Sequence, residues 1–255
     1  MFKIGIVGVG YQCNNLNEIL EPWLKLKALY PNSIFISITT ALFKEQQELG
    51  KVYDNNEMEK EVNSLLSNNK IDYFNIVKEP ILDFQSRNYC WENLKNHDLD
   101  LVWQLDLFDE YYSFEEIVNT LKWIKEEHLY DTYHVNFKNY IGINKDRYVL
   151  DFAPARINWA KKNKGIKKWY WDNWLEYNNN IKSEFSSRRI IPRAICNPKH
   201  LSWVGTKDFL INKINYQHKA IGCCSYSWNN EKQDLDFDYN YYRKFNIIIP
   251  EIHKA

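Results

Sequence analysis

Residues 87–110 read RNYCWENLKNHDLDLVWQLDLFDE, and they combine a helix pattern, a buried strand and an acidic turn. The helix is predicted over residues 88–96 and the strand over residues 98–105, where the largely apolar run is typical of a buried strand. Asp106 ends this strand, and Asp109 and Glu110 follow just beyond it. Because ligands of open α/β sheets bind at the carboxyl ends of strands, we expect the functional site at this turn.

The segments before this stretch and just after it alternate between strand and helix patterns. Apolar, β-branched runs predict strands at 3–9, 34–40 and 72–77, and apolar residues at helical spacing predict helices at 16–24, 58–66 and 114–124. We expect Pro22 to kink or shorten the first helix, and Ser113 with Glu116 forms a capping-box pattern that opens the last one. The alternation over the first 125 residues predicts a three-layer α/β fold with a mainly parallel central sheet.

The pattern changes beyond residue 130. YHVNFKNYIG (133–142) and RYVLDF (147–152) are typical of hairpin strands, whereas the Trp- and Tyr-rich stretch 167–180 has little clean periodicity. We find no repeat and no clear domain boundary. The sequence therefore predicts a single domain of residues 1–255 with an elaborated, aromatic-rich C-terminal half.

Composition excludes several classes of protein. The chain has 33 basic and 33 acidic residues and a formal net charge of zero, which argues against a nucleic-acid-binding protein. It has no apolar run long enough to span a bilayer, and its first residues, MFKIGIVGVGYQ, indicate a strand and turn rather than a secretory signal. Its five cysteines are scattered and include no C-x-x-C pair. We therefore expect a soluble, cytoplasmic protein.

The acidic turn has the composition of a site for a hard divalent cation. Carboxylate oxygens are the ligands that Mg²⁺ or Mn²⁺ prefers, and such an ion usually bridges to phosphate. Asp106, Asp109 and Glu110 could instead form a solvated loop, or supply negative charge to the N-terminus of the helix that begins near Ser113. The residues of the turn alone leave both readings open.

The surrounding sequence resembles family 2-type glycosyltransferases of the GT-A fold. Arg87-Asn88 matches an arginine–asparagine pair on a helix, LVWQLD matches the strand that follows it, and D-L-F-D-E matches the acidic turn. The first strand, helix and second strand are also similar, so the resemblance covers residues 1–125. It implies a three-layer, Rossmann-like GT-A fold in which residues 1–125 bind a nucleoside-diphosphate sugar and residues 126–255 bind the acceptor.

The resemblance also implies roles for individual residues. Arg87, beside Asn88, would contact the ribose or diphosphate of the donor, and Gly10 and Tyr11 at the end of the first strand would lie against the base. Asp106, Asp109 or both would ligate Mn²⁺ or Mg²⁺. The turn is one residue longer than the D-x-D of the family, so the sequence leaves the choice of ligand open.

The C-terminal half offers three further candidates. HLSW (200–203) is similar to an H-x-S-[YW] element of some members of this group, which implies that His200 completes the metal or diphosphate site. His218 is a second candidate. An inverting transferase needs a carboxylate base near the acceptor hydroxyl, and Asp172 lies among Trp and Tyr rings that would hold an acceptor sugar. Each of the three has a structural alternative, as an ordinary hydrogen-bonded or surface residue.

We therefore expect a metal-dependent glycosyltransferase that moves a sugar to a glycan or another hydroxyl acceptor. One alternative is an NAD-type oxidoreductase, because IGIVGVG places Gly8 and Gly10 as in a dinucleotide fingerprint. Cys13 stands at the third glycine position, however, and no acidic residue ends the second strand. A non-catalytic sugar- or nucleotide-binding module of the same fold is the other alternative. A nucleotidyltransferase would need a basic phosphate loop, which GVGYQCNN lacks.

Overall fold

The computed structural model describes residues 1–13, 15–48, 50–127, 130–160, 166–171, 174–177, 180–183, 188–222, 224–245 and 248–255. They belong to two compact units. The first unit comprises Met1–Asn136 and Ala153–Pro198, and the second comprises Phe137–Phe152 and Lys199–Ala255. The division into a donor half and an acceptor half at residue 125, within one domain, stays a prediction.

The first unit is built on a seven-stranded sheet. Its strands, in spatial order, are β13 (Arg188–Ile190), β6 (Thr132–His134), β9 (Ala155–Trp159), β4 (Leu101–Asp106), β1 (Ile4–Gly10), β2 (Ile34–Phe43) and β3 (Tyr73–Ile81). Only β9 runs antiparallel to its neighbours among the described strands of this sheet. The predicted mainly parallel sheet is confirmed.

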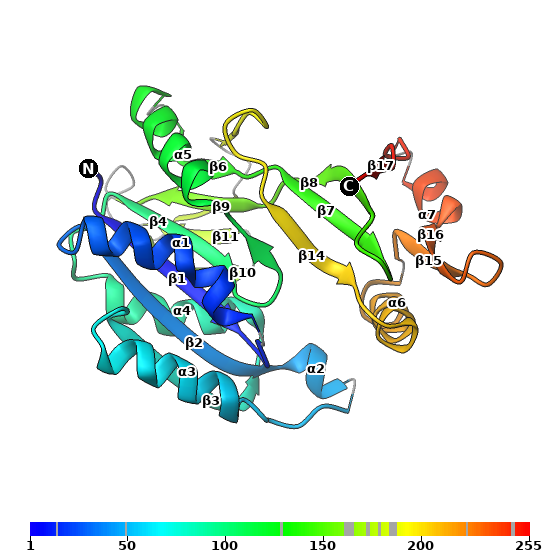
Figure 1. The fold of residues 1–255 in the computed structure, drawn as a ribbon, viewed down its shortest axis with the longest axis horizontal. Helices are drawn as coiled ribbons and strands as arrows, with labels where there is room; N and C mark the ends of the chain where they lie inside the picture. The colour runs from blue at the N-terminus through cyan, green and yellow to red at the C-terminus, as the bar shows by residue number, and fades with distance from the viewer. Residues whose placement is uncertain are drawn as a thin grey trace. The chain divides into compact units, whose positions relative to one another are not determined.

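Helices cover both faces of this sheet. They are α1 (Leu16–Leu29), α2 (Lys44–Glu48), α3 (Asn56–Ser67), α4 (Asp83–Leu94) and α5 (Phe114–Glu127). In Figure 1, α1, α3 and α5 lie on one face of the sheet and α4 lies on the other. The alternation of β1 agrees: a Cβ at Gly5 would meet Leu94 of α4 at 3.3 Å, and one at Gly10 would meet Met58 of α3 at 2.8 Å. The three-layer prediction is confirmed.

The core forms around β1, whose seven residues are all buried. On the face of α1, the rings of Trp23 and Trp103 meet edge to face with centroids 4.8 Å apart, and Tyr112 packs against both. Such pairs add about 0.5–1.5 kcal/mol beyond the burial of their area. These rings therefore hold α1 and Tyr112 against β4 at the centre of the sheet.

Three element boundaries test the local sequence rules. Pro22 does not shorten the first helix, because α1 continues past it to Leu29 and buries Trp23 and Leu26, and the alternative of a kink stays a prediction. β3 likewise runs through Pro80, which an edge strand tolerates because one side of it needs no ladder partner. The capping box is confirmed: the Ser113 N–H donates to Glu116 at 2.8 Å and the Glu116 N–H donates to Ser113 at 3.2 Å.

The remaining elements of the first unit are short. β5 (Glu110–Tyr111) follows the acidic turn, and β10 (Ile166–Trp171), β11 (Trp174–Tyr177) and β12 (Asn180–Ser183) form a three-stranded antiparallel sheet. The aromatic stretch that shows no clean periodicity is therefore partly strand.

The second unit combines a small sheet with two helices. β17 (His253–Lys254), β8 (Arg147–Phe152), β7 (Phe137–Gly142) and β14 (Lys199–Val204) are neighbours in that order, and α6 (Lys207–Ile221), β15 (Tyr226–Asn229), β16 (Asp234–Phe237) and α7 (Tyr239–Lys244) complete it. β7 and β8 pair antiparallel, as the hairpin pattern predicts. Rings of Trp203, Tyr226 and Phe237 form the centre of this unit's core.

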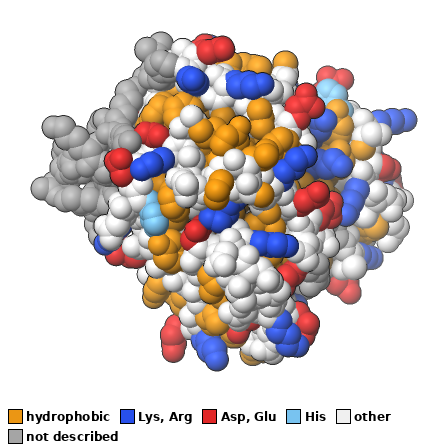
Figure 2. All heavy atoms as spheres, turned by 60° about the vertical axis from the view of Figure 1, so that its left-hand side comes forward, with side chains coloured by type: hydrophobic (Ala, Val, Ile, Leu, Met, Phe, Trp, Pro, Cys, Tyr) orange, Lys and Arg blue, Asp and Glu red, His pale blue; other side chains and the backbone are white. Residues whose placement is uncertain are grey.

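Two further features of the molecule concern the distribution of its surface charge and the length and hydropathy of its helices. On the face shown in Figure 2, acidic and basic side chains are interspersed among the coloured residues, in agreement with the zero formal net charge. Within the described part of the chain, none of the helices is both long enough and apolar enough to cross a bilayer.

Candidate functional site

The strand order places a topological switch point between β1 and β4. From β1 the chain moves outward through β2 to β3, and then returns to place β4 on the other side of β1. β1 ends at Gly10 and β4 ends at Asp106, which is in register with Val9. The Leu107 N–H donates to the Val9 carbonyl at 2.8 Å, so the turn after β4 is tied to β1. Open α/β sheets bind their ligands at such a point.

Two buried arginines hold the first carboxylate of the acidic turn. Arg87, on α4, donates through Nη2 to Asp106 at 3.0 Å and to Asp83 at 2.5 Å. Arg156, on β9, donates through Nη2 to Asp106 at 2.7 Å. The two guanidinium groups therefore fix the Asp106 carboxylate from two sides, each through a different oxygen.

Glu110 lies deeper in the same cluster. It is fully buried, and its carboxylate accepts a hydrogen bond of 2.7 Å from Nε of Arg156. Burial raises the pKa of Glu110 to about 8; Asp106 and Asp109 add to the rise, and Arg156 opposes it. Burial lowers the pKa of Arg156, but Glu110 and Asp106 outweigh this and raise it above its ordinary value. The guanidinium stays charged.

The cluster combines several carboxylates with two guanidinium groups. Its members among the described residues are Asp83, Asp106, Asp109, Glu110, Arg87 and Arg156. Asp109 is only 3% exposed and Glu110 is fully buried, whereas the side chain of Asp83 is 33% exposed. Carboxylate oxygens are the ligands that a hard divalent cation prefers.

The structure therefore brings together the carboxylates that the sequence predicts for metal binding, and it gives Arg87 a defined neighbour. Arg87 is 2% exposed, so it positions Asp106 rather than facing solvent. Asn88, next to it on α4, is half-buried. Their predicted contacts with a donor stay predictions.

Gly10 and Tyr11 lie at the switch point, as the sequence predicts for residues that approach a nucleotide. Tyr11 is 8% exposed, and its hydroxyl donates to the Val52 carbonyl at 2.9 Å. Burial, followed by the negative charge of Asp54, raises the pKa of the Tyr11 hydroxyl. Its ring therefore forms part of the wall of this edge of the sheet.

The C-terminal candidates stay predictions. His200 lies on β14 of the second unit, where it is buried and its Nδ1 lies 2.8 Å from Oδ1 of Asn139. Since the acidic turn belongs to the first unit, a role for His200 as its metal ligand is untested. His218 lies exposed in the last turn of α6. Asp172 lies outside the described residues.

Sequence reasoning missed two members of the cluster. Asp83 stands four residues before Arg87, and this helical i, i+4 spacing was a local signal for the pair. Arg156 had a weaker signal, a single basic residue in the apolar run of β9. Its position depends on the antiparallel register of β9 against β4, where Trp103 pairs with Ile157.

Two glycines of the first strand lie close to neighbouring side chains. A Cβ at Gly8 would lie 3.1 Å from Cδ1 of Leu107, and one at Gly10 would lie 2.8 Å from Cε of Met58. The Cys13 thiol donates to the Leu107 carbonyl, and burial raises the pKa of this thiol to about 12. The atoms that approach Gly8 and Gly10 most closely are the ends of flexible side chains, so these contacts leave the dinucleotide alternative a prediction.

Comparison with known proteins adds only a distant likeness. No protein-family model matches the chain, and no curated protein sequence matches it. Among solved structures, S. aureus TarS 1–349 aligns with TM-score 0.46 and 13% identity, and the same segment in complex with UDP aligns with TM-score 0.48 and 12% identity. A longer S. aureus TarS structure aligns with TM-score 0.47 and 12% identity. Each alignment covers 87% of this chain, but only 66%, 66% and 40% of the respective TarS chain. Scores below 0.5 at this identity leave any function to be argued from the residues of this chain.

Proposed function

We propose that the protein is a metal-dependent glycosyltransferase that moves a sugar from a nucleoside diphosphate to a hydroxyl of a glycan-type acceptor. The observation that carries the proposal is the cluster of four carboxylates and two arginines at the carboxyl ends of β1 and β4. This end of the sheet is where an open α/β fold binds a nucleotide.

The donor set at the turn fits Mn²⁺ or Mg²⁺. Asp109, with Asp106 or Glu110, would hold the ion, and the ion would neutralise the charge that develops on a departing nucleoside diphosphate. The buried carboxyl oxygens of Asp109 and Glu110 support this assignment, because a hard divalent cation takes oxygen ligands.

The arginines serve this site by positioning. Arg87 and Arg156 each hold one oxygen of Asp106, so this carboxylate keeps a fixed orientation without a bound ligand. Preorganised charges of this kind need little rearrangement when the leaving group becomes negative. For the acceptor we retain Asp172 as the proposed general base, and His200 as a proposed further ligand of the metal or diphosphate.

Thermal stabilisation by nucleotides tests this function. The protein is heated with UDP, GDP, CDP, dTDP, ATP or NAD, each with Mn²⁺ or with EDTA. A ligand at a hundred times its dissociation constant stabilises the folded state by about 2.7 kcal/mol, or roughly 2–4 °C for each kcal/mol in a protein of this size. We expect a manganese-dependent shift with one nucleoside diphosphate.

Two variants locate the effect. Asp109→Asn removes a charge of the turn with little change in shape, and Glu126→Gln removes one from an exposed position on α5. The shift is expected to disappear in the first variant and to persist in the second. A shift with NAD alone, indifferent to Mn²⁺ and to Asp109, would instead show an oxidoreductase. Binding of a nucleotide-sugar without hydrolysis or transfer would show a non-catalytic module.

A further inference from the structure

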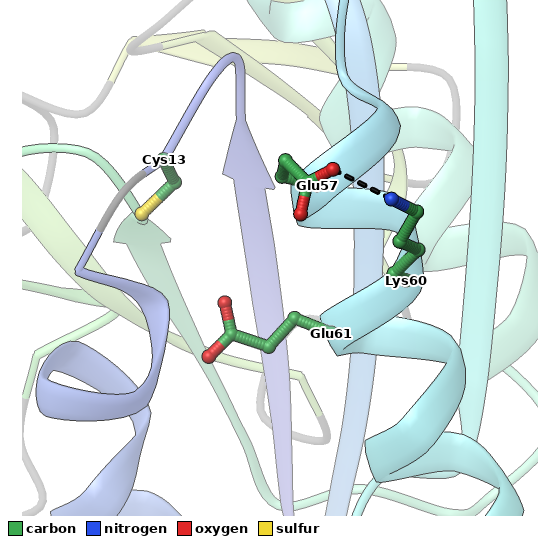
Figure 3. A pocket seen from close by; sticks show the side chains of 4 residues that line it. All are labelled: Cys13, Glu57, Lys60 and Glu61. Carbon is green, nitrogen blue, oxygen red and sulfur yellow. Dashed lines mark hydrogen bonds and ion pairs between the residues drawn. The ribbon is translucent and has the colours of Figure 1, made fainter.

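A pocket of about 450 Å³ lies beside the acidic turn in the first unit. Cys13, from the segment after β1, forms one wall, and Glu57, Lys60 and Glu61 of α3 form the other (Figure 3). The hydrogen bond from the Cys13 thiol to the Leu107 carbonyl joins this wall to the residue that follows Asp106. The volume lies within the range of small-molecule sites, about 300–1,000 Å³.

The polar side chains of the pocket differ in their hydrogen-bond partners and in their exposure. Glu57 and Lys60 are paired with each other at 2.6 Å, and both side chains are largely exposed. Glu61 is half-buried and accepts a hydrogen bond from the backbone of Asn17; burial raises its pKa, and this hydrogen bond partly offsets the rise. In Figure 3 the Glu61 carboxylate extends from α3 toward the segment that carries Cys13.

The charged groups that line the pocket limit the kinds of ligand it can bind. Glu57 and Glu61 outnumber Lys60, and the negative carboxylates would repel a phosphate. Since Glu57 is already paired with Lys60, Glu61 alone offers too few oxygens for a hard cation, which takes about six. A neutral ligand with several hydroxyl groups fits, because a carboxylate accepts hydrogen bonds from hydroxyls and an ammonium donates to their oxygens.

We propose that this pocket binds a vicinal diol of the donor, with the Glu61 carboxylate accepting its hydroxyl protons. The inference rests on the proposed function, because the pocket adjoins the turn that would hold the diphosphate. Two parts of a nucleotide-sugar carry such a diol, the ribose and the transferred sugar. Glu61 would then be a specificity-determining residue contributed by α3, outside the acidic turn.

The test compares ligands that differ only in these hydroxyl groups. Affinities are measured by calorimetry, with Mn²⁺, for UDP, 2′-deoxy-UDP and UDP-glucose, or for the corresponding GDP or CDP compounds if one of those bases is preferred. The proteins are wild type, Glu61→Gln and the exposed control Glu115→Gln. Melting temperatures of the free proteins verify that each variant is folded.

Loss of a hydrogen bond to a charged acceptor is expected to weaken binding about tenfold. If the diol is the ribose, Glu61→Gln weakens UDP about tenfold and weakens 2′-deoxy-UDP, which keeps only the 3′-hydroxyl, by a smaller factor. If it is the transferred sugar, the variant weakens UDP-glucose and leaves UDP unchanged. Equal affinities in wild type and Glu61→Gln for every ligand, or an equal loss for all of them, would overturn the inference while leaving the transferase standing. Absence of binding by wild type would overturn the proposed function itself.

Discussion

Arg156 should be the most costly single residue to remove from the acidic cluster. Its side chain is 6% exposed and contacts Asp106 at 2.7 Å and Glu110 at 2.5 Å. In Arg156→Met, Asp106 keeps Arg87 but loses its shorter ion pair, and Glu110 loses its hydrogen-bond donor while it remains fully buried. Breaking a buried ion pair by removing one partner costs about 3–5 kcal/mol, because the remaining charge is left uncompensated.

Urea unfolding at neutral pH, followed by circular dichroism, measures this loss. The matched control is Lys95→Met, which removes an exposed ion pair with Glu92 and should cost less than about 1 kcal/mol. A midpoint of Arg156→Met that lies within the range of the control would refute the reasoning. It would mean that Asp106 and Glu110 lose Arg156 at no cost in stability, so that the cluster is no preorganised site.

Three further predictions concern the stability of the fold, and each depends on a different physical effect. Asn55→Ala should cost about 1–3 kcal/mol in urea unfolding, because the buried Asn55 side chain accepts the Gln12 N–H at 2.7 Å and its removal leaves that donor unsatisfied. Gly142→Ala should cost about 1–3 kcal/mol, because φ is +96° there and a Cβ would meet Asp234; an unchanged melting temperature would contradict this. Burial lowers the pKa of His134 below 6.5, so the unfolded chain takes up the proton first and the free energy of unfolding should fall as pH drops below about 6.5. The difference between the urea midpoints at pH 7 and at pH 5 should therefore be smaller in His134→Gln than in the wild type.

The layered fold was predictable because its signals are local. β1 and β2 are apolar runs that bury both faces, and α3 and α5 have apolar residues at helical spacing that bury one face, whatever their partners are. The errors arose where packing outweighs a local rule. Trp23 and Leu26 bury themselves against the sheet, and this stabilises α1 beyond Pro22 despite the missing N–H.

The site was predictable only in part, for a related reason. Asp106, Asp109 and Glu110 stand together in the sequence at the end of a strand, so their proximity follows from chain order. Arg156 arrives from a strand 50 residues beyond Asp106, and only the pairing of β9 with β4 brings it there. No spacing within the sequence encodes that register.

The most direct test of the account is whether the acidic turn holds a divalent metal together with a nucleotide. Electron paramagnetic resonance of Mn²⁺ distinguishes free from bound ion, and the titration is made with and without the nucleoside diphosphate that stabilises the protein. The account predicts one tightly bound Mn²⁺ per chain in the presence of the nucleotide, lost in Asp109→Asn and retained in Glu126→Gln. Undiminished Mn²⁺ binding by a folded Asp109→Asn, or no binding by wild type, would contradict it.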